Sequence, residues 1–234
     1  MSRVLARPAA TALALVGGSL LVVVGLLVGV ALAGSASAAP AEDSVDAGFA
    51  RDMQVHHGQA VEMSVLVRER SDDAELRQLA LDIELTQQNQ QGRMAGWLSS
   101  WGLPQSSTLP VMGWMSGPFA GDGEHTGMAG MDTATGRTDA EGAGNPMTAM
   151  GMATPDQMAA LRASDGVEAE RLFLQLMIDH HSGGVAMADV AAEEASQSYV
   201  RDLAQSMVDA QSAELTVLQD MLDERGGPVD LADA

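Results

Sequence analysis

The apolar residues between 45 and 100 recur at steps of three and four, and glycine and proline are scarce among them. This spacing is typical of amphipathic helices. The polar stretch "SDDAE" interrupts the pattern, so the sequence predicts one helix over about 45–70 and a second that runs to about residue 100. Asp72 and Glu75 fit a capping box at the start of the second helix, and Gly102 fits the C-cap at its end.

The same pattern occurs a second time in the chain. A shift of 124 residues aligns 49–104 with 173–228 without a gap, and 14 of the 56 aligned pairs are identical. The chain therefore contains an internal duplication, and its second copy predicts helices over about 167–194 and 199–225. Two antiparallel helical hairpins are expected to form an all-α four-helix bundle.

The segment between the two copies is rich in glycine, serine, threonine, proline and methionine, and it lacks helical periodicity. It predicts a flexible linker without a buried element. A short helix should follow it, because Thr154, Pro155 and Gln157 fit the N-cap and the first and third helical positions. The predicted organisation is a first hairpin over 41–104, the linker over 105–153, the short helix and second hairpin over 154–228, and a tail over 229–234, with 41–228 forming one bundle domain.

Residues 1–40 predict an export segment. Arg3 and Arg7 precede an apolar run over about 9–33, and the following "GSASAAP" fits a cleavage site of small residues. The run is longer than the roughly 7 to 15 residues of most signal peptides and approaches the roughly 20 that span a bilayer. A cleaved signal peptide and an uncleaved membrane anchor both stay open. In either case the charge distribution places the part from Pro40 onward outside the cytoplasm.

Composition narrows the chemistry further. The 12 basic residues are all arginine and face 32 acidic residues, which gives a formal net charge of −20. Such a surface repels phosphate backbones, so a nucleic-acid partner is not expected, whereas cations are attracted. The chain has no cysteine, which excludes disulfides, thiolate metal sites and cysteine nucleophiles. A soft-metal site would have to use methionine sulfur.

Both copies carry the pattern M-x2-H-H-x5-M. Its members are Met53, His56, His57 and Met63 in the first copy, and Met177, His180, His181 and Met187 in the second. On a helix the four positions of each copy project from one broad stripe. Imidazole combined with thioether sulfur suits Cu(I), and imidazole alone also holds Cu(II). Zn²⁺, Mg²⁺ and Ca²⁺ are poorly matched to thioether ligands.

A simpler explanation exists for each residue type. A methionine at helical spacing usually fills a gap in a core, and a lone histidine on an apolar face is usually structural. The duplication favours metal binding, because both copies keep all four donors in register and packing alone does not require adjacent imidazoles. Whether the two stripes form one shared site or two separate sites stays open.

The linker adds further sulfur donors. "MGWM", "MAGM" and "MTAM" each place two methionines three residues apart. A glycine-rich mobile segment has no core to fill, which favours a weak, flexible Cu(I)-capturing arm, with low-complexity drift as the alternative. Its candidate ligands are Met112, Met115, His125, Met128, Met131, Met147, Met150 and Met152.

Catalytic motifs are missing from the sequence. A ferritin-like di-iron site would require Glu-x-x-His pairs, and the chain has none. G-x-S-x-G and phosphate-loop motifs are also missing. Asp52, Glu62 and Asp179 flank the histidine pairs and are expected on the solvated surface or as outer partners of imidazole N–H groups. No catalytic or cofactor-binding residue is assigned.

The stretches "FARDMQVHHGQAVEM", "TPDQMAAL" and "RLFLQLMIDHHSGGVAMA" together resemble the domain of unknown function 305 family over about 44–227. The resemblance implies a ferritin-like four-helix bundle that is exported, with some members binding copper outside the cytoplasm and assisting copper tolerance. The family's metal-linked pattern falls on the same four histidines and four methionines named above, without a departure. The linker methionines match only a general tendency of the family.

The leading expectation is an exported copper-binding protein that sequesters or hands on Cu(I), with Cu(II) as the second ion. Its partners would be the metal ion, other copper-handling proteins and, if the N-terminal segment is uncleaved, a membrane. A ferritin-like metal-dependent oxidoreductase and a structural or signalling bundle without metal are the alternatives. The non-enzymatic role is favoured because a buffer needs many exchangeable soft ligands, whereas a redox enzyme needs a defined open coordination position.

Overall fold

The computed structural model describes Val24 and residues 38–116 and 146–230. The chain divides into two compact units, 1–39 and 40–234, and the second unit contains the helical hairpins. The predicted export segment over 1–40 lies almost entirely outside the described residues. Among the helices that the structure describes, none has the length and apolarity needed to cross a membrane.

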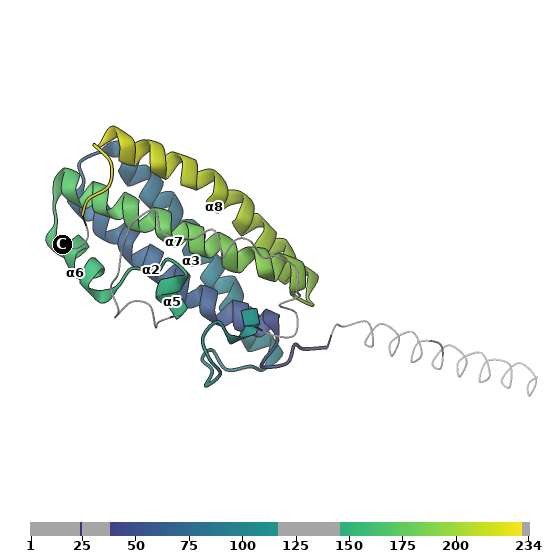
Figure 1. Ribbon diagram of the computed structural model, residues 1–234. Coiled ribbons are helices and arrows are strands. Elements are labelled where there is room, and N and C mark those ends of the chain that lie inside the picture. Colours follow the sequence, from purple (N-terminus) through teal and green to yellow (C-terminus); the bar gives the residue numbers. More distant parts are fainter. Residues whose placement is uncertain (1–23, 25–37, 117–145, 231–234) are drawn as a thin grey trace, which may run out of the picture. The chain divides into compact units, whose positions relative to one another are not determined.

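Four long helices form two hairpins, as Figure 1 shows. α2 (Val45–Arg70) is followed by α3 (Ala74–Trp101), and α7 (Gly166–Glu194) by α8 (Ser198–Glu224). The two helices of each hairpin pack closely together, and the hairpins meet mainly through α2 and α7. The described residues form helices and turns without a strand, which confirms the all-α prediction.

Three short elements connect or flank the hairpins. They are η1 (Gly113–Ser116), α5 (Pro146–Ala149) and α6 (Pro155–Ala163). η1 contacts α2, and α6 contacts both α2 and α7. The chain on both sides of the middle of the linker is therefore held against α2.

Helix ends follow the local signals with one exception. Gly102 ends α3 in the left-handed region with φ of 72°, where glycine has no Cβ penalty. Thr154 is the N-cap of α6, as predicted, and Gln157 completes a capping box with it. At the start of α3, however, Asp73 and not Asp72 is the N-cap, and its side chain accepts a backbone N–H of the first turn. The predicted capping box is wrong because the helix begins one residue later than expected.

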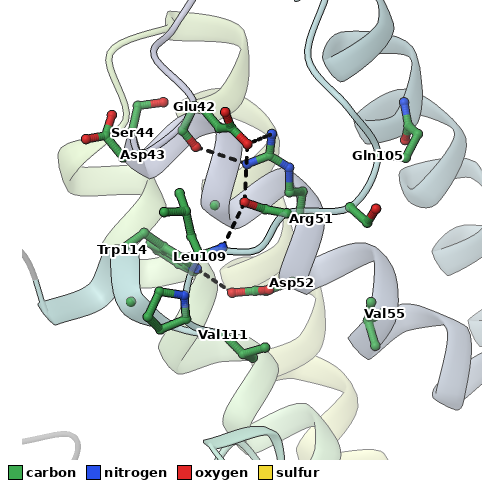
Figure 2. A pocket seen from close by; sticks show the side chains of 15 residues that line it. Glu42, Asp43, Ser44, Arg51, Asp52, Val55, Gln105, Leu109, Val111 and Trp114 are labelled. Atoms are coloured by element: carbon green, nitrogen blue, oxygen red, sulfur yellow. Dashed lines mark hydrogen bonds and ion pairs between the residues drawn. The ribbon is translucent and has the colours of Figure 1, made fainter.

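The expectation that the linker has no buried element is wrong at both of its ends. Met112 and Trp114 are buried on one side of the gap, and Met150 and Ala153 on the other. The Asp52 carboxylate accepts hydrogen bonds from the Met112 N–H and the Trp114 indole N–H, each at 2.8 Å. Figure 2 shows the bond between Asp52 and Trp114. Long-range contacts of this kind hold a segment whose local sequence lacks a helical period. Residues 117–145, the middle of the predicted linker, lie outside the described residues.

The apolar core consists of two clusters. The first contains, among others, Phe49, Met53, Met94, Met187 and Met207, and is called the Met53 cluster. The second contains, among others, Met63, Ile83, Phe173, Met177 and Leu218, and is called the Met63 cluster. Every long helix contributes residues to both clusters, so each helix crosses from one to the other along its length.

Two buried carboxylates at equivalent positions of the duplication lock the hairpins together. Asp46, near the start of α2, accepts hydrogen bonds from the backbone N–H groups of Ser196 and Gln197 and from the Ser196 hydroxyl, all at 2.9 Å. Glu170, near the start of α7, accepts the Ser71 hydroxyl at 2.7 Å. Each hairpin thus binds the turn of the other. The sequence carries this signal only as two acids separated by 124 residues.

We expect Asp46→Ala to lower the free energy of unfolding by about 2–4 kcal/mol, because buried N–H groups lose a charged acceptor. Asp43→Ala removes an exposed acid just ahead of the same helix and should change it by less than about 0.5 kcal/mol. Chemical denaturation followed by circular dichroism measures both. Equal stability of the two variants would contradict the role assigned to Asp46.

Candidate metal centre

A layer of polar residues separates the two apolar clusters. It is called the polar layer and consists of His56 and His57 on α2, Gln87 and Gln90 on α3, His180 and His181 on α7, and Gln211 and Glu214 on α8. The four histidines are completely buried, and the three glutamines nearly so. Polar groups at this depth destabilise a fold unless they find partners. Their contacts therefore decide what the layer can do.

The two histidine pairs meet at the centre of the layer. The rings of His56 and His180 lie with centroids 3.7 Å apart and planes inclined by 32°. The His57 ring lies 6.4 Å from that of His56, and the His181 ring 6.3 Å from that of His180. The two helical stripes thus form one continuous cluster of four imidazoles.

Every Nε2 atom of the four rings has an oxygen partner. The pairs are His56 with the Met150 carbonyl at 3.0 Å, His57 with Gln90 Oε1 at 2.6 Å, His180 with the His56 carbonyl at 2.9 Å, and His181 with Glu214 Oε2 at 2.7 Å. Carbonyl and carboxylate oxygens only accept, so each Nε2 carries the hydrogen and donates it. In the neutral ring the lone pair then lies on Nδ1.

All four Nδ1 atoms are buried and have no hydrogen-bond partner. An unpartnered buried acceptor is uncommon in native proteins and needs an explanation. A neutral imidazole with Nε2–H fixed by an oxygen and Nδ1 free has the arrangement of a metal-ligating histidine. The same arrangement occurs at all four positions.

Burial keeps three of these rings, those of His56, His57 and His180, neutral. Desolvation lowers the pKa of His56 from 6.5 to about 4, with a smaller opposing effect of the Met150 carbonyl. Desolvation, helped by the neighbouring His56, lowers the pKa of His57 to about 3. It also holds the pKa of His180 well below 6.5. The Nδ1 lone pairs of these three rings are therefore present well into the acidic range.

The four motif methionines lie on both sides of the histidines. Met53 and Met187 belong to the Met53 cluster, Met63 and Met177 to the Met63 cluster, and all four are fully buried. Among the described residues, no group of three or more His, Asp or Glu side chains could hold a metal ion by itself.

The predicted linker ligands are dispersed. Met112 and Met150 are buried in the Met53 cluster, and Met115 and Met147 pack against it. These four methionines therefore help to fill the core, contrary to the expectation for the linker. Met152 is partly exposed. His125, Met128 and Met131 lie outside the described residues.

A surface cavity of about 370 Å³ lies elsewhere, between the start of α2 and residues 105–114 (Figure 2). Arg51 and Asp52 contribute polar groups, while Val55, Leu109 and Trp114 contribute apolar walls. The Arg51 guanidinium donates to the backbone carbonyls of Pro104 and Glu42. No histidine lines the cavity, so it is separate from the polar layer.

Residues 46–222 match the family described as Domain of unknown function (DUF305). The chain belongs to the DUF305 family. No curated protein is similar enough in sequence to count as a match.

Solved structures of DUF305 proteins are similar to this chain. A protein from Streptomyces coelicolor, thought to be secreted, is 44% identical with a TM-score of 0.65, and the match covers 81% of this chain and 99% of that one. A fragment from Deinococcus radiodurans is 29% identical with a TM-score of 0.56, covering 77% and 96%. CopM in its Cu(I)-bound form is 20% identical with a TM-score of 0.51, covering 76% and 96%. CopM was also solved in a Cu(II)-bound form at 21% identity, and at this identity the likeness concerns the fold.

Sequence reasoning missed the oxygen partners of this DUF305 site. Gln90 and Glu214 follow the second histidine of each pair by 33 residues. The same shift that aligns the histidines also aligns these two polar residues, so the signal was present. The flanking acids behave differently: Asp52 binds the linker end, and Glu62 pairs with Arg162 at the surface. Neither of them is an outer partner of an imidazole.

Gly183 allows the linker end to reach the histidines. A Cβ at this position would overlap the Met150 carbonyl that accepts the His56 Nε2 hydrogen. We expect Gly183→Ala to lower the free energy of unfolding by about 1–3 kcal/mol through overpacking. Gly96→Ala is the matched control, because its Cβ would meet open space in the interior of α3, and it should raise stability by roughly 0.5–1 kcal/mol. Thermal denaturation gives both values, and a stabilising Gly183→Ala would contradict this packing.

Acid should destabilise the metal-free protein through the buried imidazoles. The unfolded chain binds protons near pH 6.5, whereas folded His56 and His57 bind them only near 4 and 3, so protons favour the unfolded state. The contribution of these rings to the free energy of unfolding is complete above about pH 6.5. It falls as the pH drops towards 4, by about 1.4 kcal/mol for each unit by which the pKa of a ring differs between the unfolded and folded states. Denaturant titrations at several pH values measure the slope.

Carboxylates titrate in the same pH range as these imidazoles. The wild type is therefore compared with His57→Gln, which keeps the carboxylates and removes one imidazole. The wild type should lose more stability than this variant between pH 7 and 4. Parallel pH profiles for the two proteins would show that His57 is not held neutral.

Proposed function

We propose that this DUF305 protein binds copper outside the cytoplasm and sequesters it or passes it on, without catalysing a reaction. One observation carries the proposal. Four buried imidazoles present unpartnered Nδ1 atoms, while their Nε2 atoms are fixed by oxygens. Such a set of donors destabilises a protein that binds nothing and suits one that binds a metal ion.

The donor types favour copper over other ions. Thioether sulfur has no proton to lose, and three of the imidazoles stay neutral below their ordinary pKa. Both donors are therefore ready at mildly acidic pH. Sulfur with imidazole nitrogen suits Cu(I), and imidazole nitrogen also suits Cu(II). The residues that would hold the ion are His56, His57, His180 and His181 with Met53, Met63, Met177 and Met187.

The outer partners would orient the ligands. Gln90 and Glu214 each accept an Nε2 hydrogen and hold the ring plane of His57 or His181. A carboxylate at Glu214 also makes its imidazole a stronger donor than an amide would. The two halves of the duplication would thus present ligands of unequal basicity to one ion or to neighbouring ions.

The relatives support the ion, the compartment and the fold. CopM, which shares this fold, was solved with Cu(I) and with Cu(II). The DUF305 protein from Streptomyces coelicolor is thought to be secreted. We extend these properties to this chain, with a ferritin-like four-helix bundle as its architecture and other copper-handling proteins as its partners. The N-terminal segment would act as a cleaved signal or as an anchor.

Competition titration with a Cu(I) chelator tests the proposal on the full chain. The key variant replaces Met53, Met63, Met177 and Met187 by leucine, because this exchange nearly conserves volume and removes only the sulfur. We expect its Cu(I) affinity to fall by at least about tenfold. A second variant with the four paired histidines changed to alanine should lose both Cu(I) and Cu(II).

Met221→Leu, which changes a buried methionine outside the motif and the linker, is the control and should bind as the wild type does. Binding of both copper ions by the quadruple histidine variant at wild-type affinity would overturn the proposed site.

Met128→Leu with Met131→Leu tests the linker separately. If this variant binds as many copper ions per chain as the wild type, the linker only connects the two hairpins and does not bind copper.

A further inference from the structure

Two buried glutamines in the polar layer have amide atoms without partners. Gln87 and Gln211 occupy equivalent positions in the duplication and are 3% and 4% exposed. Neither the nitrogen nor the oxygen of the Gln87 amide has a hydrogen-bond partner, and the Gln211 oxygen has none either. Glutamine is rarely buried in this state, because the amide loses its bonds to water and gains nothing in return.

Both glutamines lie beside the histidine cluster. Gln87 precedes Gln90, the partner of His57, by nearly one turn of α3, and Gln211 precedes Glu214, the partner of His181, by nearly one turn of α8. The Gln211 oxygen and the His56 Cε1 atom both crowd the position that a Cβ of Gly184 would take. The Gln211 oxygen therefore lies near Cε1 of His56, the ring carbon between the two nitrogens.

The apolar residues around the two glutamines argue against a role of these amides in packing alone. On α3 the buried neighbours on either side of the layer are Ile83 and Met94, and on α8 they are Met207 and Leu218. An aliphatic side chain at position 87 or 211 would fill the same space without leaving a polar atom unpaired. Only 14 of 56 aligned pairs are identical between the two copies, and this glutamine is one of them.

We propose that the side-chain oxygens of Gln87 and Gln211 are further donors of the metal centre and serve the oxidised ion, Cu(II). This inference rests on the proposed function. Amide oxygen is a harder donor than thioether sulfur, and Cu(II) accepts nitrogen and oxygen ligands, whereas Cu(I) prefers sulfur and nitrogen. The imidazoles are common to both ions. Methionine sulfur from the two apolar clusters completes the ligand set for Cu(I). Glutamine oxygen from α3 and α8 completes the ligand set for Cu(II).

The test replaces both glutamines by methionine in the full chain. Methionine has a similar length and shape, but it exchanges a hard oxygen for a soft sulfur. We expect the Cu(II) affinity to fall by about tenfold or more, with a change in the Cu(II) electron paramagnetic resonance spectrum that reports a lost oxygen ligand. The Cu(I) affinity should stay the same or rise. The metal-free variant should be no less stable than the wild type, because it loses unpaired amide atoms.

A second pair, Gln87→Leu with Gln211→Leu, supplies no donor and should lower only the Cu(II) affinity. Gln88→Met with Gln205→Met is the matched control, because both residues are exposed on the same two helices. Equal losses for Cu(I) and Cu(II), or no loss for either, would overturn the inference while leaving the proposed function in place. A wild-type chain that binds neither ion would overturn the proposed function itself.

Discussion

The stack of His56 on His180 is the contact on which the rest of the polar layer depends. With their centroids 3.7 Å apart in a buried interior, the two rings cannot both carry charge. As neutral rings they can each donate one Nε2 hydrogen, and His180 gives its own to the His56 carbonyl, which ties α7 to the backbone of α2. The outer rings then bind Gln90 on α3 and Glu214 on α8. Through its inner and outer rings the histidine cluster thus connects all four helices.

The two halves of the duplication differ in one hydrogen bond of the histidine cluster, and the linker supplies its acceptor. If the two halves were equivalent, His56 would donate to the His180 carbonyl, but it donates to Met150 instead. The segment that contains Met150 lies against α7, where Gly183 leaves room for its carbonyl. A residue outside both repeats therefore fixes one of the four rings. The stretch that the sequence marks as a connection is partly a component of the site.

Much of the fold follows from local signals, whereas the site depends on contacts that such signals do not contain. The helix over 45–70 and the end at Gly102 agree with the structure because periodicity and caps act within one or two turns. The burial of Trp114 and Met150 was not predictable in this way, because it arises from partners far along the chain. The motif predicted which histidines matter, but their stacking and their unpartnered Nδ1 atoms required the helix packing.

The same unpartnered atoms connect stability with binding. In the metal-free protein the layer holds four Nδ1 atoms and three amide atoms without hydrogen bonds, and each such atom lowers the stability of the folded state. The clusters on either side and the buried carboxylates Asp46 and Glu170 must offset that loss. An ion that engages the Nδ1 lone pairs binds the folded state alone, so its binding free energy adds to the free energy of folding. A layer that weakens the empty protein is therefore the part through which a metal ion stabilises it most.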